Sequence, residues 1–227
     1  MILKKPVVIG KSTLYLADCM TYMAGLPDKA FDLAIVDPPY FDVSSEKNYL
    51  SPGSKISTTG VKRHTADFKT WKKPTPKYFL ELKRVSEHQI IWGCNYYAGI
   101  DLPVGRIVWD KQSDESSFSD GEEAACSLIK SLRFYRYRWN GMLQGDMKNK
   151  EQRIHPNQKP VKLYEWLLTN YAKPGQRILD THLGSGSSAI AANNLGFEFV
   201  GMELDADYFK AACQRIEQAT AQTRMFA

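Results

Sequence analysis

The sequence predicts an α/β fold with a mostly parallel sheet, and three observations support this prediction. Apolar runs of strand length alternate with helical segments along most of the 227 residues. The run FDLAIVD at 31–37 is nearly continuous in apolar residues, as expected of a strand whose sheet is covered on both faces. A further strand at 177–182 leads through a glycine turn into a helix. Strands that alternate with helices are typical of parallel sheets, so we expect one α/β domain over residues 1–227.

The first half of the chain supplies five elements. STLYLAD at 12–18 predicts a strand, and a short helix is expected from 19 to 25. The apolar strand at 31–37 follows. PKYFLELKRVSEH at 76–88 has the spacing of a helix, and QIIWGC at 89–94 predicts the next strand.

The middle of the chain predicts further strands and one helix. RIVWDK at 106–111 has the composition of a strand, and 122–130 and 133–139 predict strands near an edge of the sheet. VKLYEWLLTNYA at 161–172 predicts an amphipathic helix that KPGQ terminates.

The last segment repeats the strand and helix alternation. RILDTH at 177–182 predicts a strand, and the segment 185–196 predicts a helix that ends at a glycine. EFVGMEL at 198–204 predicts another strand, and 206–222 predicts the final helix. No internal repeat or domain boundary is evident.

Composition is that of an ordinary globular protein, with 43% hydrophobic and 24% charged residues. No run of about 18 apolar residues is present, so we expect no membrane span. The first residues lack the apolar core and cleavage site of a signal peptide. The four cysteines are scattered without a C-x-x-C pair, which argues against a zinc site or a disulfide framework. We therefore expect a cytoplasmic protein without a metal.

A long basic segment follows the strand at 31–37. Residues 44–77 contain eight Lys or Arg and only two acids, although the whole chain has a net charge of only +5. The segment is rich in Ser, Thr, Gly and Pro and has no clear period, which predicts a long loop. Such loops are usually functional or disordered, and a merely solvated loop remains an alternative. Its basic residues include Lys47, Lys55, Lys62 and Arg63.

The loop ILDTHLGSGSSAIA predicts a binding site at the end of a strand. After Asp180, the glycines Gly184 and Gly186 let the backbone approach a ligand closely, and the helix start that follows favours a negative group. Glu203 ends the next strand and is placed to bind ribose hydroxyls. This pattern indicates an adenosine cofactor. It also fits a loose dinucleotide fingerprint that includes Ala189, or a structural turn without a ligand.

The second candidate loop is DPPY, which ends the strand at 31–37. Pro38 holds Asp37 in an extended conformation, and neither Pro38 nor Pro39 has a backbone N–H, so the turn offers acceptors and few donors. The Asp37 carboxylate and the Pro38 carbonyl can accept the two hydrogens of an amino group while Tyr40 stacks on the ring that carries it. The alternative is a structural Pro-Pro turn with a surface aromatic residue.

Together, DPPY and DTHLGSGSS resemble the amino-methyltransferases that use S-adenosylmethionine. More narrowly, they resemble the DNA adenine-N6 methyltransferases in the permuted order called class β, where the catalytic motif precedes the cofactor motif. LYLADC, IIWGCNYYA, RIVWDK, HPNQKPVKL and VGMELDADYF also resemble family segments, so the resemblance covers nearly the whole chain. Thr181 and His182 depart from the usual Pro-Phe pair, and we expect His182 to be a packing residue.

The resemblance implies a Rossmann-like class I methyltransferase fold, circularly permuted, with a seven-stranded sheet and helices on both faces. It implies that the four DPPY residues are catalytic. It places the acid of LYLADC at the cofactor adenine and HPNQKP at the methionine end. The implied cofactor-binding residues are Asp18, Cys19, Asp37, His155, Gln158, Lys159, Asp180, Leu183, Gly184, Ser185, Gly186, Ser187, Glu203 and Leu204.

The implied chemistry agrees with the residue types. The exocyclic nitrogen of adenine is a poor nucleophile, and two acceptors at its hydrogens, Asp37 and the Pro38 carbonyl, would free its lone pair. Most of the rate gain would come from positioning and preorganised electrostatics. A cation–π contact from Tyr40 or Phe41 to the sulfonium is also possible. An adenine in a duplex must leave the stack to reach such a site, which implies double-stranded DNA as partner.

Two segments are candidates for holding that DNA. They are the basic loop 44–77, with Lys47, Lys55, Lys62 and Arg63 as candidate contacts, and a short insertion at 139–153, with Lys148 and Lys150. For the preceding run 133–139, a strand with its aromatic residues on one packed face is the favoured alternative. Both candidate segments are short for reading a base sequence, so we expect a short recognition sequence.

Three other functions remain open. Cytosine-N4 methylation uses the same chemistry, but the family more often has Ser-Pro-Pro-Tyr there, so Asp37 favours adenine. A non-catalytic nucleic-acid-binding protein on this fold would not need intact motifs. A nicotinamide-dependent oxidoreductase leaves DPPY and HPNQKP unexplained. A homodimer and a separate cognate endonuclease, as in restriction-modification, are possible partners.

Overall fold

A computed structural model of the chain describes residues 5–42, 71–113, 119–140 and 143–225. Within these ranges, nine strands form one sheet in the order β1-β2-β11-β10-β3-β4-β6-β5-β7, and β8 and β9 form a separate pair. The strands are β1 (Val7–Ile9), β2 (Ser12–Leu16), β3 (Phe31–Val36), β4 (Ser86–Trp92), β5 (Gly105–Asp110), β6 (Gly121–Cys126), β7 (Leu132–Arg136), β8 (Trp139–Asn140), β9 (Leu143–Gln144), β10 (Arg177–Asp180) and β11 (Glu198–Glu203). The helices are α1 (Cys19–Ala24), α2 (Pro76–Val85), α3 (Val161–Tyr171), α4 (Ser187–Leu195), α5 (Ala206–Met225) and the 3₁₀ turn η2 (Cys94–Tyr96).

The sheet is mostly parallel. Strands β2, β11, β10, β3 and β4 pair in parallel, and so do β5 and β7. Strand β6 lies antiparallel between β4 and β5, and β1 pairs antiparallel with β2. The start of β6 therefore meets the carboxyl ends of the parallel strands at one edge, where ligands of open α/β sheets bind.

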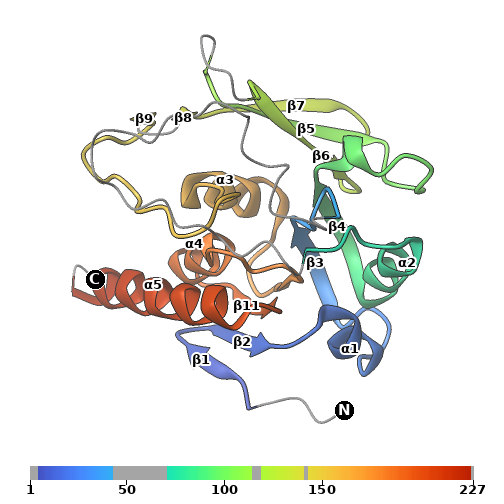
Figure 1. The fold of residues 1–227 in the computed structure, drawn as a ribbon, viewed down its shortest axis with the longest axis horizontal. Helices are drawn as coiled ribbons and strands as arrows, with labels where there is room; N and C mark the ends of the chain where they lie inside the picture. The colour runs from blue at the N-terminus through green and yellow to red at the C-terminus, as the bar shows by residue number, and fades with distance from the viewer. Residues whose placement is uncertain (1–4, 43–70, 114–118, 141–142, 226–227) are drawn as a thin grey trace.

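Helices cover the two faces of the sheet (Figure 1), with α3, α4 and α5 on one face and α1 and α2 on the other. Strand β3 shows why its sequence is continuously apolar. Leu33 and Ile35 pack in the core beneath α3 and α4, whereas Ala34 and Val36 pack in the core beneath α1 and α2. Successive side chains of a strand point to opposite faces, so both cores need apolar residues.

The α/β class is confirmed, but the expected seven strands are wrong, because the sheet has nine strands in the described ranges alone. Strand β1 has only three residues and pairs with β2 across a turn at Gly10, whose φ is +59°. The expected strand at 133–139 ends at Arg136, and Trp139 belongs to the β8–β9 pair. The expected helix at 76–88 ends at Val85, because Ser86 is extended and pairs with β3.

Three further observations bear on function. None of the helices in the described ranges is long and apolar enough to cross a membrane. Those same ranges contain no cluster of three or more His, Cys, Asp and Glu that could hold a metal ion. All four cysteines are free thiols.

Candidate active site

The loops at the carboxyl edge of the sheet enclose a cavity of about 360 Å³. Its walls come from the loops after β2, β3, β10 and β11 and from the segment 155–159 that precedes α3. Most of the residues that the sequence predicts at a cofactor line this one cavity: Asp18, Cys19, Asp37, His155, Gln158, Lys159, Leu183, Gly184, Ser185, Ser187, Glu203 and Leu204. Two predicted residues, Asp180 and Gly186, do not line it and lie behind it.

The glycine turn between β10 and α4 is fixed by Glu203. One oxygen of that carboxylate accepts a 2.9 Å hydrogen bond from the Gly184 N–H, and the other accepts from the N–H groups of Leu204 and Asp205. Burial raises the pKa of Glu203, and these backbone donors oppose the rise. A carboxylate has about four acceptor sites, so three bonds leave capacity for a ligand hydroxyl. Glu203 thus both shapes the turn and faces the cavity.

Gly186 begins α4 in the left-handed region, with φ +76°. A Cβ at this position would lie 2.8 Å from the Ile216 side chain of α5, so a larger residue would force the turn and helix apart. Behind the turn, Asp180 accepts hydrogen bonds from Ser188 Oγ and the His182 N–H. Burial raises the pKa of Asp180 to about 7. Asp180 therefore supports the turn from inside the protein.

At the other end of the cavity, Asp18 caps α1. Its Oδ1 accepts hydrogen bonds from the backbone N–H and the hydroxyl of Thr21, at 2.8 and 3.1 Å. The neighbouring Cys19 thiol has a pKa raised to about 12 by burial, so it is neutral and unreactive at physiological pH. The apolar thiol and the capped carboxylate form a wall suited to an uncharged, planar group.

The two histidines of the predicted segments are both in aromatic surroundings. The His155 ring stacks on Trp71 and meets Tyr208 edge-on, with centroids 5.4 and 4.5 Å apart. His182 packs edge-on against Tyr78, and its Nδ1 shares a 2.9 Å hydrogen bond with the Thr181 hydroxyl. Burial lowers the pKa of each histidine to about 4, so both are neutral at pH 7.

All four DPPY residues line this cavity. Tyr40 donates a 2.5 Å hydrogen bond to Asp37 Oδ1 and stacks on Tyr96, with ring centroids 4.8 Å apart. Gly93 makes room for the Tyr40 ring, since a Cβ there would overlap it at 2.0 Å. The Pro38 carbonyl points to the hydroxyl of a buried tyrosine after η2. Asp37, Pro38 and Tyr40 are thus held in one orientation.

A second cavity, of about 630 Å³, opens on the far side of Tyr40. Tyr40 and Gln158 line both cavities, and Trp139 lines only the second. Ser113 Oγ and Trp139 Nε1, both buried in this second wall, have no hydrogen-bond partner among the described residues. Two cavities that meet at Tyr40 can hold two reactants, one on each side of its ring.

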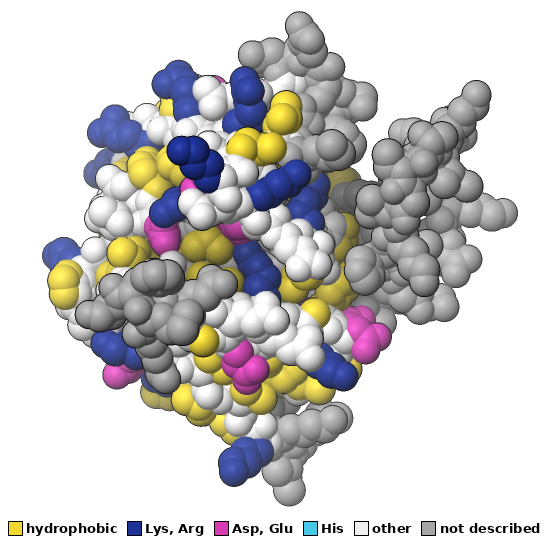
Figure 2. All heavy atoms as spheres, turned by 90° about the vertical axis from the view of Figure 1, so that its left-hand side faces the viewer, with side chains coloured by type: hydrophobic (Ala, Val, Ile, Leu, Met, Phe, Trp, Pro, Cys, Tyr) yellow, Lys and Arg dark blue, Asp and Glu magenta, His cyan; other side chains and the backbone are white. Residues whose placement is uncertain are grey.

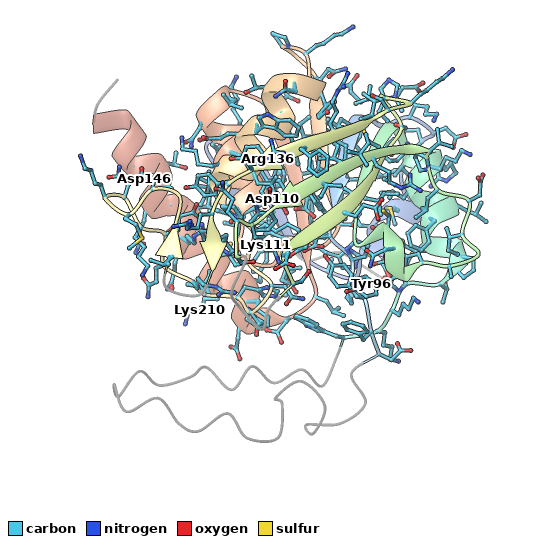
Figure 3. The ribbon with its side chains drawn as sticks, turned by 90° about the horizontal axis from the view of Figure 1, so that it is seen from above. Tyr96, Asp110, Lys111, Arg136, Asp146 and Lys210 are labelled. Atoms are coloured by element: carbon cyan, nitrogen blue, oxygen red, sulfur yellow. The ribbon has the colours of Figure 1, made fainter. Side chains whose placement is uncertain are left out.

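Two charged residues near DPPY have no counterpart in the sequence prediction. Glu122 begins β6 and Lys111 follows β5, and they form a 2.6 Å ion pair in the wall of the second cavity. In Figure 3, Lys111 lies next to Asp110, which pairs with Arg136 of the neighbouring β7 at 3.2 Å. The only sequence signal for Lys111 is its position after a strand. Nothing in the sequence shows that the start of β6 lies at this edge.

The predicted DNA contacts fall in two places. Lys47, Lys55, Lys62 and Arg63 lie outside the described residues. Lys148 and Lys150 are exposed in the segment after β9. Figure 2 shows the left-hand face of Figure 1, where Lys and Arg side chains gather on the upper part of the surface around a hollow.

Comparisons with known proteins identify a family. The sequence model of an N6/N4 family described as DNA methylase matches residues 55–214, which is more than half of the chain but excludes DPPY. YubD of Escherichia coli (strain K12) is 28% identical over 204 residues, covering 88% of this chain and 87% of YubD. The Type II methyltransferase M2.DpnII of Streptococcus pneumoniae is 24% identical over 251 residues, covering 92% of this chain and 90% of its own.

Solved structures share the fold. The M1.HpyAVI–SAM complex has a TM-score of 0.54 at 20% identity and covers 90% of this chain and 99% of its own. The cytosine-N4-specific PvuII DNA methyltransferase has a TM-score of 0.58 at 10% identity and covers 97% of this chain and 96% of its own. At these identities the likeness is one of fold, and it extends over nearly the whole chain.

Proposed function

The chain belongs to the N6/N4 DNA methylase family, and on that premise we propose that it transfers a methyl group from S-adenosylmethionine to the N6 amino group of adenine in duplex DNA. The observation that carries the proposal is that Asp37 and Pro38 line the first cavity next to Tyr40, the DPPY residue that lines both cavities. A methyl donor on one side and an amino-bearing base on the other would meet at these acceptors.

The 360 Å³ cavity suits S-adenosylmethionine in size and in chemistry. Glu203 has acceptor capacity for ribose hydroxyls, and the wall formed by Asp18 and Cys19 suits an adenine ring. TTHA0409 of Thermus thermophilus, with a TM-score of 0.55, was crystallised with this cofactor, as M1.HpyAVI was. When bound, the cofactor supplies an electrophilic sulfonium methyl group. The predicted cofactor roles of the cavity residues form part of this proposal, with the exception of Lys159, whose ammonium contacts Asp37.

The DPPY turn would hold the amino group. Asp37 and the Pro38 carbonyl accept hydrogen bonds from its two N–H groups, which turns the nitrogen lone pair toward the methyl group. Tyr40 already stacks on one aromatic ring, Tyr96, so a planar base could take the same kind of contact. The gain comes from orienting the nucleophile rather than from a covalent intermediate.

Adenine is favoured over cytosine because Asp37 takes the position where the cytosine-N4 enzymes more often have serine. The second candidate is cytosine-N4 methylation, since the PvuII enzyme named for that activity shares this fold over nearly its whole length. Both products require the same orientation of an amino group, and the two cavities fit either base.

We propose further that residues 1–227 form one methyltransferase domain in the permuted order. The strand that carries Asp37 precedes the glycine turn in the chain, which is the order the class β enzymes have. The basic loop 44–77 and the segment 139–153 would bind the DNA from which the base is flipped. A cognate endonuclease or a second copy of the chain are partners consistent with this function.

The test is to incubate the protein with tritiated S-adenosylmethionine and mixed-sequence duplex DNA, digest the DNA to nucleosides and identify the labelled one by mass. We expect N6-methyladenine in the DNA treated with wild type and none with Asp37→Asn. N4-methylcytosine as the main product would contradict adenine methylation and support the second candidate, cytosine-N4 methylation. Cofactor and DNA binding without transfer would indicate a non-catalytic protein.

A further inference from the structure

A buried row of alternating charges connects the two cavities. Lys159 forms ion pairs with Asp37 Oδ2 and, at 2.9 Å, with Glu122 Oε2. Glu122 in turn pairs with Lys111 at 2.6 Å. The Lys159 side chain is 2% exposed, and those of Asp37, Glu122 and Lys111 are 15%, 23% and 15% exposed. Removing charges from water costs desolvation free energy unless the charges are paired, so this arrangement needs an explanation.

The three N–H groups of the Lys159 ammonium are all used within this row. They reach Asp37, Glu122 and, at 3.2 Å, the Tyr40 hydroxyl oxygen. The rings of Tyr40 and Trp92 lie 5.8 and 5.5 Å from its nitrogen and stabilise the positive charge. Because an ammonium has three donors, Lys159 in this arrangement has none left for a ligand in the cofactor cavity.

Asp37 needs such a partner. Its ionised form is the better acceptor for an amino group, because both oxygens then accept, whereas protonation makes one of them a donor. The groups that act on it are the Lys159 ammonium, the Glu122 carboxylate, the hydroxyls of Tyr40 and Tyr97, and, from behind, Asp180 and Tyr164. Only Lys159 among these carries a positive charge.

The directions of the pKa shifts of these three groups follow from this geometry. The pKa of Asp37 is raised, mainly by burial; the Lys159 ammonium limits this rise, and the Glu122 carboxylate adds to it. Burial disfavours the charged form of Lys159, yet Asp37 and Glu122 raise its pKa above the ordinary value. Burial alone would also raise the pKa of Glu122, but Lys159 and Lys111 lower it to about 2.

We propose that Lys159 is a positioning residue for the methyl transfer: shared between Asp37 and Glu122, its ammonium keeps the Asp37 carboxylate ionised and correctly turned toward the amino group of the base. Glu122 holds the ammonium on the side away from the cofactor cavity, so that Asp37 is paired but keeps acceptor capacity. The role of Asp37 in this inference rests on the proposed function, whereas the effect of Lys159 on its ionisation does not.

The first experiment measures that ionisation directly. In protein labelled with ¹³C at the aspartate carboxyl groups, Asp37→Asn identifies the Asp37 resonance, which is then titrated in wild type and variants. In Lys159→Met we expect the Asp37 carboxyl to titrate about one to three pH units higher, the usual effect of removing an adjacent opposite charge. In Glu122→Gln we expect it to titrate lower, because a like charge is lost. The matched control is Lys162→Met, an exposed lysine on the first turn of α3 that pairs with Glu165.

The second experiment measures methyl transfer against pH under single-turnover conditions. Lys159→Met should move the acid limb of the rate profile upward by the same one to three units and recover most of its rate at alkaline pH. Lys159→Arg should restore the wild-type limb in part. Rates lowered equally at every pH, with an unshifted Asp37 resonance, would overturn the proposal. If Lys159→Met does not fold, Glu122→Gln still tests the proposal. An Asp37 titration that is unshifted or raised in Glu122→Gln would overturn it. A wild type that transfers no methyl group refutes the proposed function, while the titration still decides the inference.

Discussion

The hydroxyl of Tyr97 donates a 2.8 Å hydrogen bond to the carbonyl oxygen of Pro38. Tyr97 is 3% exposed and packs against Phe79 of α2, so the donor is fixed by the core of the protein. A carbonyl oxygen has two lone pairs, and one remains for the amino group that we place there. The second acceptor of the site is therefore oriented from behind by a residue that lines neither cavity.

From this contact we expect Tyr97→Phe to lower kcat by about fivefold, the equivalent of one net hydrogen bond of about 1 kcal/mol, with little change in cofactor affinity. The measurement is steady-state methylation of mixed-sequence DNA. Tyr171→Phe, at the end of α3, is the matched control and should retain full activity. An unchanged kcat in Tyr97→Phe would mean that the Pro38 carbonyl needs no support.

Asp37→Ala should reduce turnover at least about a hundredfold, the scale of losing one preorganised electrostatic contact. Affinity for S-adenosylmethionine should change little, because we assign Asp37 to the base. Calorimetry and a methylation assay measure the two effects separately. Asp101→Ala removes a carboxylate that is 97% exposed and serves as the control. Near-normal turnover of Asp37→Ala would remove the proposed mechanism.

Glu203→Gln should weaken cofactor binding by roughly one to three kcal/mol, because the amide has one acceptor oxygen for the turn and the ribose hydroxyls together. The carboxylate now accepts three backbone hydrogen bonds, so thermal unfolding of the free protein should also shift downward. Glu198→Gln, at the exposed start of β11, controls for charge. Unchanged cofactor affinity, or tight NAD binding by the wild type, contradicts the assignment of the glycine turn.

Burial of the neutral His182 ring should contribute stability that is lost as pH drops from about 6.5 to about 4. Burial lowers the pKa of His182 from 6.5 to about 4, so in this window the unfolded chain binds a proton that the folded chain does not. Stability contributed by the neutral ring is complete above pH 6.5 and is lost toward pH 4. Urea midpoints of His182→Phe should therefore fall less than those of wild type as pH drops across this window. The contributions that remain include His155, which has the same shift, and Asp180, whose raised pKa acts in the opposite direction. An unchanged slope would mean that His182 is exposed to solvent.

Neutralising Lys55, Lys62 and Arg63 together should weaken DNA binding and flatten the plot of log affinity against log salt by about two to three units, nearly one for each lost phosphate contact. Fluorescence anisotropy with duplex DNA at several salt concentrations measures this. Replacing Lys83 and Lys173, exposed on α2 and after α3, should leave the slope unchanged. If the triple variant keeps the wild-type slope, the loop is merely solvated.

Local signals in the sequence were enough for the fold class and for two of the loops around the site. The apolar run at β3 indicates a strand buried on both faces. Gly186 indicates a left-handed backbone conformation that glycine adopts without strain. Both are properties of neighbouring residues, so they can be seen without the fold. The carboxyl-edge rule then brings DPPY and the glycine turn together, because their strands β3 and β10 pair in parallel.

Only the tertiary structure decided what surrounds Asp37. Lys159 lies 122 residues away in the chain, and the sequence assigned it to the cofactor rather than to the Asp37 carboxylate. Glu122 was not predicted because β6 inserts antiparallel between β4 and β5, which brings the start of a strand to an edge where strand ends are expected. The ionisation of a buried carboxylate depends on every charge within a few ångströms, and those charges come from segments whose proximity only the folded chain determines.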